Sequence, residues 1–332
     1  EFDEESEVCT VHLSAPLDPQ HAAHVAMVLD FEAPLTERLS GLYRAPYDAT
    51  ASEADRRFMA VTQFEATYAR QAFPCWDEPE HKATFAVSLE VDEALTALSN
   101  MPAVREERHE ERGTKTVWFA QTPAMATYLL AVVVGEFDSV ETTTKEGGVT
   151  VRVYTPRGRS EMGRFALEVG AWALDYYAAY FALPYPLPKL DMVAIPDFDA
   201  GAMENWGLVT YQEASLLLDA SCNTRSQQLV ATTVTHELAH QWFGNLVTMR
   251  WWNDLWLNEG FATFMETQAA AARFPQLDFW TTFLLQDLFA ALEMDANPHT
   301  HAIDVCVRTA GDIAEIFDAV SYSKGASLIR ML

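Results

Sequence analysis

The sequence predicts an α+β fold in two parts, a β-rich domain over residues 1–152 and an α-rich domain over residues 153–332. Before residue 152, short β-branched and aromatic runs alternate with turn-forming residues, a pattern typical of strands joined by tight turns. After Pro156, apolar residues recur every three or four positions, which is the period of an amphipathic helix. A length of 332 residues also suits about two domains, at roughly 150 residues each.

The first half contains several segments with the pattern of strands. Residues 149–154 alternate apolar and polar side chains, so one face would be buried and the other exposed. The charged run from Glu106 to Arg112 is expected at a solvated hairpin tip. We therefore expect a sandwich-like or saddle-like domain, whose strands include residues 85–91, 116–120, 128–134 and 149–154.

The second half is expected to be mainly helical. Apolar residues from Met162 to Phe181 fall three and four positions apart and predict one amphipathic helix, which Pro184 keeps from continuing. Residues 190–195 are expected to form a short buried strand, and helices are expected to dominate from Gln227 onward.

Charge and composition exclude several classes of partner. Acidic residues number 48 and basic residues 22, which gives a net charge of −26 and a pI of about 4.5. Nucleic acid and anionic bilayers would be repelled, whereas a positively charged chain end would be attracted. No apolar stretch is long enough to predict a transmembrane helix, and residues 1–10 lack the pattern of a signal peptide.

The cysteines are scattered and form no CxxC pair; they are Cys9, Cys75, Cys222 and Cys306. Such sparse cysteines favour reduced thiols over a disulfide framework. The expected location is therefore cytoplasmic, with a secreted or organellar-lumen protein carrying one or two bridges as the alternative. We make no prediction of the oligomeric state.

Residues 235–240, Thr-His-Glu-Leu-Ala-His, have the spacing of a metal site. On a helix, residues four apart share one face, so His236 and His240 can present both imidazoles to a single ion. Composition alone gives roughly 0.04 such patterns in a chain of this length. The alternative is a helix with two ordinary histidines.

Glu259 is the expected third ligand. Asn258 is a candidate N-cap for a helix that runs to about Arg273, which would place Glu259 in its first turn. Two neighbouring helices would then supply three ligands and leave a fourth position for water, as in catalytic rather than structural zinc sites. Nitrogen and oxygen ligands favour zinc over calcium or magnesium, so we expect one Zn²⁺ per chain.

Two further glutamates have expected roles beside the ion. Glu237, adjacent to a ligand, is the candidate general base, because a carboxylate in reach of zinc-activated water can take its proton and pass it to a leaving amine. Glu266 lies two helical turns after Glu259 and can accept an N–H from a ligand histidine, which would fix the tautomer. A solvent-facing helix acid is the equal alternative for Glu266.

Two segments bear on which bond would be cut. The first is the stretch Gly-Ala-Met-Glu-Asn-Trp-Gly, in which Gly201 lets a ligand approach the backbone closely. An exposed strand edge at this stretch could bind an extended peptide by main-chain hydrogen bonds, and Glu204 would bring a carboxylate to that edge. The stretch Thr-Gln-Phe-Glu supplies Gln63 and Glu65. Two carboxylates in a channel suit the ammonium of a peptide N-terminus, although either short motif by itself more often marks an ordinary turn or strand.

Together, these motifs resemble those of the zinc aminopeptidases of the gluzincin group, most closely the puromycin-sensitive aminopeptidase subfamily. The resemblance covers about residues 60–332 and rests on residues 62–79, 185–189, 201–211, 236–249 and 316–326. It implies a thermolysin-like catalytic domain after the β-rich domain. Chains of this family begin with further strands and continue into a large helical C-terminal domain. This chain is therefore expected to be a fragment whose catalytic domain is truncated at its C-terminus.

The resemblance also implies a role for each motif residue. His236, His240 and Glu259 match the zinc ligands. Glu237 matches the general base, and Tyr322 matches the tyrosine that stabilises the oxyanion, a sound role for a phenol donor. The residues that match substrate-binding groups are Gln63, Glu65, Gly201, Ala202, Met203, Glu204 and Phe317. For the last of these, a plain core phenylalanine is the alternative.

The predicted function is that of a metallo-aminopeptidase, which cleaves the N-terminal peptide bond of peptides with a free N-terminus. By resemblance, Glu204, Glu65 and Gln63 would hold the α-amino group of the substrate. Two alternatives stay open. An endopeptidase on a thermolysin-like frame would accept a blocked N-terminus, and a scaffold or binding protein would keep the zinc helices without turnover.

Overall fold

The structure, a computed structural model, describes residues 1–3, 7–15, 25–48 and 56–332. These residues fall into two compact units, residues 1–32 and residues 33–332. In its described part, the first unit contains one short antiparallel pair, β1 (Phe2–Asp3) with β2 (Val8–Cys9). All other described helices and strands, and every predicted site residue, belong to the second unit.

The β-rich part of the second unit contains two antiparallel sheets. Their strands are β3 (Gly41–Pro46), β4 (Phe58–Gln63), β5 (Ser88–Asp92), β6 (Thr96–Ser99), β7 (Ala103–His109), β8 (Thr114–Phe119) and β9 (Val132–Gly135). The strand order is β3-β4-β9-β6 in the larger sheet and β5-β8-β7 in the smaller one. Alternate residues of the larger sheet, among them Tyr43, Met59 and Val133, are fully buried, as expected for a sheet with one face on a core.

One strand prediction in this part is wrong over half its length. Strands overlap residues 85–91 and 116–120 as predicted, but in residues 128–134 the first part forms a 3-10 turn, Thr127–Leu129, and only the second part is strand. Tyr128 and Leu129 are fully buried in this turn. A short, continuous apolar run suits a buried turn as well as a buried strand, so its pattern does not distinguish the two.

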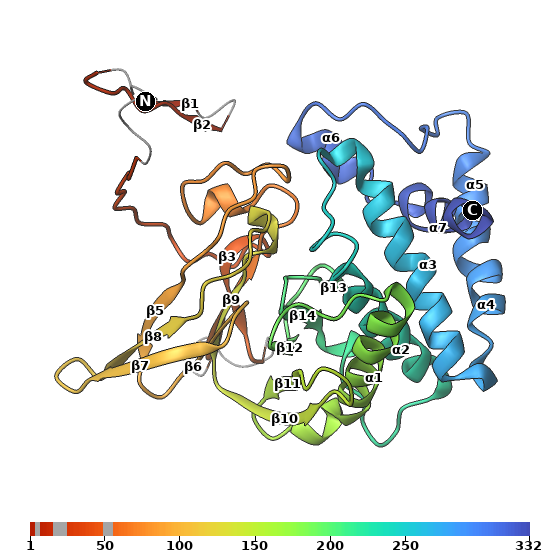
Figure 1. The fold of residues 1–332 in the computed structure, drawn as a ribbon, viewed down its shortest axis with the longest axis horizontal. Helices are drawn as coiled ribbons and strands as arrows, with labels where there is room; N and C mark the ends of the chain where they lie inside the picture. Colours follow the sequence, from red (N-terminus) through yellow and green to blue (C-terminus); the bar gives the residue numbers. More distant parts are fainter. Residues whose placement is uncertain (4–6, 16–24, 49–55) are drawn as a thin grey trace. The chain divides into compact units, whose positions relative to one another are not determined.

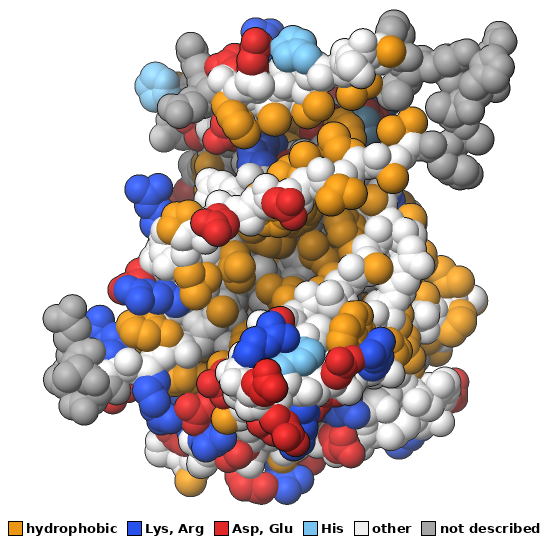
Figure 2. Space-filling model, turned by 90° about the vertical axis from the view of Figure 1, so that its left-hand side faces the viewer, with side chains coloured by type: hydrophobic (Ala, Val, Ile, Leu, Met, Phe, Trp, Pro, Cys, Tyr) orange, Lys and Arg blue, Asp and Glu red, His pale blue; other side chains and the backbone are white. Residues whose placement is uncertain are grey.

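β7 and β8 form the charged hairpin that was predicted from the run of acidic and basic residues. The side chains of β7 are almost all exposed. Charges of the hairpin pair with β5 and the turn after it, with Arg108 2.9 Å from Glu93 and Arg112 3.0 Å from Glu90. Figure 2 looks onto this side of the molecule and shows acidic and basic side chains interspersed. Exposed pairs of this kind add little stability, so their effect is to keep the hairpin solvated.

A five-stranded sheet supports the helical part. Its strands are β10 (Phe137–Thr143), β11 (Thr150–Pro156), β12 (Lys189–Ile195), β13 (Ala202–Met203) and β14 (Leu208–Gln212). Their order is β10-β11-β12-β14-β13, with the three central strands parallel and β13 antiparallel at one edge. β12 is buried at every residue, as predicted for residues 190–195 and as expected for a parallel strand covered on both faces. The boundary placed after residue 152 falls within β11, and it stays a prediction.

One helix lies between β11 and β12 in the chain, and the other helices follow β14. The helices are α1 (Arg164–Phe181), α2 (Thr224–His240), α3 (Leu255–Arg273), α4 (Phe279–Thr282), α5 (Phe289–Asp295), α6 (Ala310–Glu315) and α7 (Gly325–Met331). A π-helical turn, η8 (Val320–Lys324), precedes α7. α1 packs against β10 and β11, and α2 packs against both α1 and α3 (Figure 1). The predicted α+β fold, β-rich first and helical second, is thus confirmed. Within the described ranges, no helix combines the length and apolarity needed to cross a bilayer.

A buried ammonium group joins the β-rich part to the sheet of the helical part. Lys189 Nζ donates to Asp191 Oδ2, to the Ser99 carbonyl oxygen at the end of β6, and to the Gly207 carbonyl oxygen before β14, each at 2.7 Å. Asn100 makes a second link, since its Nδ2 donates to the Trp206 carbonyl oxygen at 3.0 Å. The segment that precedes β14 is therefore held against the β-rich part by polar groups that water does not reach.

Candidate active site

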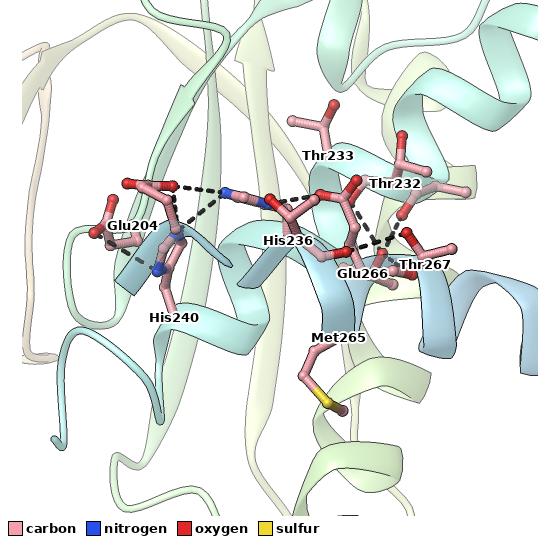
Figure 3. A network of polar contacts seen from close by, with 12 residues as sticks. Glu204, Thr232, Thr233, His236, His240, Met265, Glu266 and Thr267 are labelled. Atoms are coloured by element: carbon pink, nitrogen blue, oxygen red, sulfur yellow. Dashed lines mark hydrogen bonds and ion pairs between the residues drawn. The ribbon is translucent and has the colours of Figure 1, made fainter. Parts of the chain in front are cut away.

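The centre of the site lies between α2 and α3, whose mutual position is fixed by a buried tyrosine. The Tyr177 hydroxyl lies 2.7 Å from the carbonyl oxygen of Thr235 on α2 and 3.2 Å from that of Met265 on α3. Figure 3 shows the result, a row of polar side chains in which His240 and His236 lie between Glu204 and Glu266. The predicted helix spacing thus brings both imidazoles to the face of α2 that meets α3.

Three donor atoms converge at this face. The Nε2 atoms of His236 and His240 are 3.0 Å apart, and Glu259 Oε2 lies 3.3 Å from the first and 3.4 Å from the second. In a four-coordinate zinc site with bonds of about 2.0–2.1 Å, tetrahedral angles place the donor atoms about 3.3 Å apart. The three donors therefore have the spacing that fits one zinc ion.

The other ring nitrogens show which atoms face the ion. His236 Nδ1 lies 2.6 Å from Glu266 Oε2, and His240 Nδ1 lies 2.9 Å from Asn258 Oδ1 and 3.0 Å from the Phe243 carbonyl oxygen. These partners are acceptors, so each Nδ1 carries a hydrogen, and in the neutral imidazole Nε2 is then the nitrogen with a lone pair for a metal ion. In that form, two lone pairs and a carboxylate oxygen at about 3 Å from one another could hold a metal ion between them.

Negative charge dominates around these donors. Burial disfavours the charged form of His240, but Glu204 and Glu259 outweigh this and raise its pKa to about 9. Burial also disfavours the charged form of His236, but Glu266 and Glu259 outweigh it and hold the pKa of His236 well above its ordinary value. For Glu259, the cost of burial is outweighed by His240 and His236, and its pKa falls to about 2. A pocket that stabilises cationic imidazoles so strongly also favours a divalent cation.

Glu237 stands beside the three donors and has one unpaired atom. The residue is buried on α2, and its Oε2 finds no hydrogen-bond partner among the described residues. Burial raises the pKa of Glu237 to about 8, in spite of the opposing effect of His236 and His240. A buried carboxylate oxygen without a protein partner needs a water or a ligand N–H as its partner.

A second cluster of carboxylates adjoins the first. Oxygens of Glu65, Glu204 and Glu259 all lie within 4.8 Å of one another, although Glu65 follows β4 and Glu204 follows β13. Burial and the Glu204 carboxylate raise the pKa of Glu65 well above its ordinary value. Three carboxylates directed at one point repel one another unless a cationic group lies among them. The two clusters share Glu259, so the cation sites are neighbours.

Gln63 lies next to this cluster and contacts the edge strand. Its Nε2 lies 3.3 Å from the Met203 sulfur on β13, and its Oε1 has no partner among the described residues. A Cβ placed on Gly201 would meet nothing within 4 Å, so there is open space beside this part of the edge. Ala202 is partly exposed on β13. The structure thus brings the predicted substrate-binding residues of both segments together.

Tyr322 and Phe317 lie in the last part of the chain. The Tyr322 ring is nearly parallel to the His236 ring, with centroids 6.0 Å apart and planes at 11°. Burial and the Glu259 carboxylate hold the pKa of the Tyr322 phenol well above its usual range, so it stays a donor. Phe317 is half-buried and packs against the main hydrophobic core. It is not among the contacts that define the carboxylate clusters, so its pocket role stays a prediction.

The predicted helix cap at Asn258 is wrong. α3 begins at Leu255 with Asp254 as its N-cap residue, because a 3-10 turn, Trp252–Asp254, leads straight into the helix. Asn258 is instead buried inside α3, where Oδ1 accepts from His240 Nδ1 and Nδ2 donates to Glu204 Oε1 at 3.4 Å. Asparagine is unfavourable within a helix, so an asparagine directly before Glu259 could have indicated that its side chain has a polar partner in the site.

Comparison with known proteins agrees with this geometry. Residues 165–332 match the family model of the peptidase family M1 domain, and residues 1–129 match that of the peptidase M1 N-terminal domain. The chain belongs to peptidase family M1. The predicted resemblance to aminopeptidases, puromycin-sensitive aminopeptidase among them, is confirmed by this match together with relatives that carry these names.

Relatives of this M1 family chain are longer proteins. It is 53% identical to aminopeptidase M1-C of Oryza sativa subsp. japonica over 307 residues, which are 92% of this chain and 34% of the relative. It is 45% identical to puromycin-sensitive aminopeptidase of Caenorhabditis elegans over 333 residues, 100% of this chain and 34% of the relative. With leucyl aminopeptidase of Saccharolobus solfataricus it shares 45% identity over 306 residues, 92% of this chain and 38% of the relative. The chain thus spans about a third of the length of these curated relatives.

Proposed function

We propose that this chain carries the active site of a zinc metallo-aminopeptidase, which hydrolyses the N-terminal bond of peptides with a free amino group. One observation carries the proposal: the site for a metal ion and the site for a second cation share Glu259. A peptide's ammonium held by the second cluster has its first carbonyl only a few atoms away, within reach of the metal. An endopeptidase would have no use for an ammonium site at this distance.

The residues that would hold zinc are His236, His240 and Glu259, with Glu266 and Asn258 orienting the two imidazoles. When bound there, zinc supplies Lewis acidity, which polarises a carbonyl oxygen and lowers the pKa of a water to about 7. His240 and Glu259 are buried, whereas His236 is partly exposed.

Glu65 and Glu204 bind and orient the substrate. Their carboxylates form ion pairs with its ammonium group, aided by the unpaired Oε1 of Gln63. The edge strand β13 can add main-chain hydrogen bonds to an extended peptide, because its partner β14 lies on its other side. Together these contacts fix the first peptide bond in one register, which supplies much of the rate enhancement.

Glu237 and Tyr322 act on the reacting atoms. Glu237 Oε2 takes a proton from the attacking water and delivers it to the departing amine, a role open to it because this buried oxygen has no hydrogen-bond partner among the described residues. The Tyr322 phenol donates a hydrogen bond to the oxygen on which negative charge develops. Each group therefore contributes most in the transition state rather than in the bound substrate.

We further propose a cytoplasmic location. Cys75, Cys222 and Cys306 carry free thiols in the described structure, which suits a reducing compartment.

A pair of reporter substrates tests the proposed function. The zinc-loaded 332-residue chain should cleave leucyl-aminomethylcoumarin and should leave its N-acetylated form intact. Glu237→Gln should lower kcat by about 10²-fold or more, because proton transfer is lost. Glu168→Gln, an exposed change on α1, is the matched control and should have no effect. Equal cleavage of both reporters would indicate an endopeptidase, and zinc binding without turnover would indicate a binding protein.

A further inference from the structure

Gln241 occupies a special place at the end of α2. It follows His240 directly, is the C-cap residue of the helix, and is fully buried. Its side chain contacts the segment that links β13 to β14. None of the roles assigned above uses it.

Both ends of the Gln241 amide are engaged. Nε2 lies 3.1 Å from the Glu204 carbonyl oxygen and 3.2 Å from the Glu237 carbonyl oxygen. Oε1 accepts from the Gly207 N–H at 3.2 Å and from the Tyr185 hydroxyl at 3.4 Å. One side chain therefore contacts the backbone of the ammonium-binding Glu204 and the backbone of the general base.

The sheet does not supply these contacts to Glu204. β13 ends at Met203, and its ladder to β14 consists of two residue pairs, Ala202 with Tyr211 and Met203 with Thr210. The Glu204 carbonyl oxygen is bound instead by two side chains, Gln241 Nε2 and Asn245 Nδ2, the latter at 2.8 Å. Because a buried carbonyl must be paired, these side chains decide where Glu204 lies relative to α2.

We propose that Gln241 is a positioning residue of the aminopeptidase site. It sets the separation between the ammonium-binding carboxylate of Glu204 and the donor atoms on α2, and thus the register in which a peptide's first bond reaches the metal. The inference rests on the proposed function. Misplacement of a substrate by about 1 Å can cost about 10²-fold in rate, so a contact of this kind matters even though it touches no substrate.

Two zinc-binding inhibitors can measure this register without turnover. Leucine hydroxamate carries an α-amino group, and its des-amino analogue, 4-methylpentanoyl hydroxamate, does not. The ratio of their affinities, measured by calorimetry on the zinc-loaded chain, reports how well the ammonium site is aligned with the metal. Zinc stoichiometry and melting temperature are measured in parallel.

In Gln241→Met, which keeps the length but lacks the amide, the affinity ratio should fall about tenfold. The des-amino inhibitor should bind as it does to wild type, and zinc should remain at one per chain. The matched control is Gln228→Met on the same helix, which removes a 2.8 Å hydrogen bond from Gln228 Nε2 to the Leu277 carbonyl oxygen. That variant should keep the wild-type ratio even if its melting temperature falls.

Several outcomes would overturn the inference. An unchanged ratio in Gln241→Met would do so, as would an equal loss for both inhibitors, which a merely structural role would cause. If Gln241→Met does not fold, Gln241→Glu replaces it, because a glutamate keeps the acceptor for the Gly207 N–H and loses the donor to the Glu204 carbonyl oxygen. The affinity ratio of the two inhibitors must then fall about tenfold in Gln241→Glu. Failure of the proposed function looks different, because wild type itself would then show no preference for the amino-bearing inhibitor.

Discussion

Gly260 of α3 and Gly325 of α7 are in backbone contact. A Cβ on Gly260 would lie 2.9 Å from the carbonyl carbon of Gly325, closer than real side chains approach. This contact seats η8 against α3, so that Tyr322 lies over the helix that carries Glu259. The close approach depends on the absence of a side chain at both positions.

Replacing Gly260 by alanine should therefore separate α7 from α3. Overpacking of this kind typically costs about 1–3 kcal/mol in free energy of unfolding, which a urea titration would measure. Because Tyr322 moves with α7, kcat should fall further than the loss of folded protein explains. Gly311→Ala in α6 is the control, since its Cβ would meet only Thr309 Oγ1 at 3.7 Å, and it should leave both quantities near wild type.

Glu266 should control zinc affinity through His236. In Glu266→Gln the charged partner of His236 Nδ1 becomes neutral, and we expect zinc affinity to fall about 10–100-fold. Competition with a chromophoric chelator measures this directly. Glu293→Gln, an exposed change on α5, should bind zinc as wild type does. Unaltered affinity in Glu266→Gln would mean that Glu266 is an ordinary helix acid.

Loss of the Tyr322 hydroxyl should affect the chemical step. We expect Tyr322→Phe to lower kcat by about 10²–10³-fold, the usual effect of removing one oxyanion donor, with little change in KM. Zinc content should stay at one per chain. Tyr180→Phe, at an exposed tyrosine of α1, serves as the control. A parallel rise in KM would show that the phenol binds the substrate rather than the transition state.

His301 and Asp318 should make stability depend on pH. His301 Nε2 lies 2.6 Å from Asp318 Oδ2, while Asp318 Oδ1 accepts from the N–H groups of Val320 and Ser321 at the start of η8. Burial and Lys324 oppose protonation of His301, but the hydrogen bond to Asp318 outweighs them and raises its pKa. The pair therefore stabilises the fold fully below the unfolded pKa of about 6.5, and loses this effect as pH rises through the higher folded pKa.

The comparison of wild type with His301→Gln tests that sign. Urea unfolding should show a larger difference in free energy at pH 6 than at pH 9, of at most about 1 kcal/mol for a partly exposed pair. His299→Gln, two residues away and exposed, should show no such pH-dependent difference. A difference that grows with pH would contradict the assignment.

Local spacing explains which parts of the site were predictable. His236, His240 and Glu266 could be placed because helix geometry alone sets which residues share a face. The position of Asn258 could not be predicted, because a preceding 3-10 turn sets the start of α3 and no capping side chain marks it. Tyr322 reaches the site through a contact between two helices distant in sequence, which no local pattern encodes. In the β-rich part, residues 128–134 were ambiguous for another reason, because a short, continuous apolar run suits a buried turn as well as a buried strand.

The ammonium of Lys189 has a consequence for protein engineering. Its three acceptors come from two sheets, so neither the strand-rich half nor the helical half is chemically complete alone. Transplanting one half between relatives would succeed only if the end of β6 presents a carbonyl at the same point. Severing the chain at residue 152 would leave Lys189 with Asp191 and Gly207 but without the Ser99 carbonyl, and would expose the buried face that Ser99 now covers, so we expect that piece to aggregate.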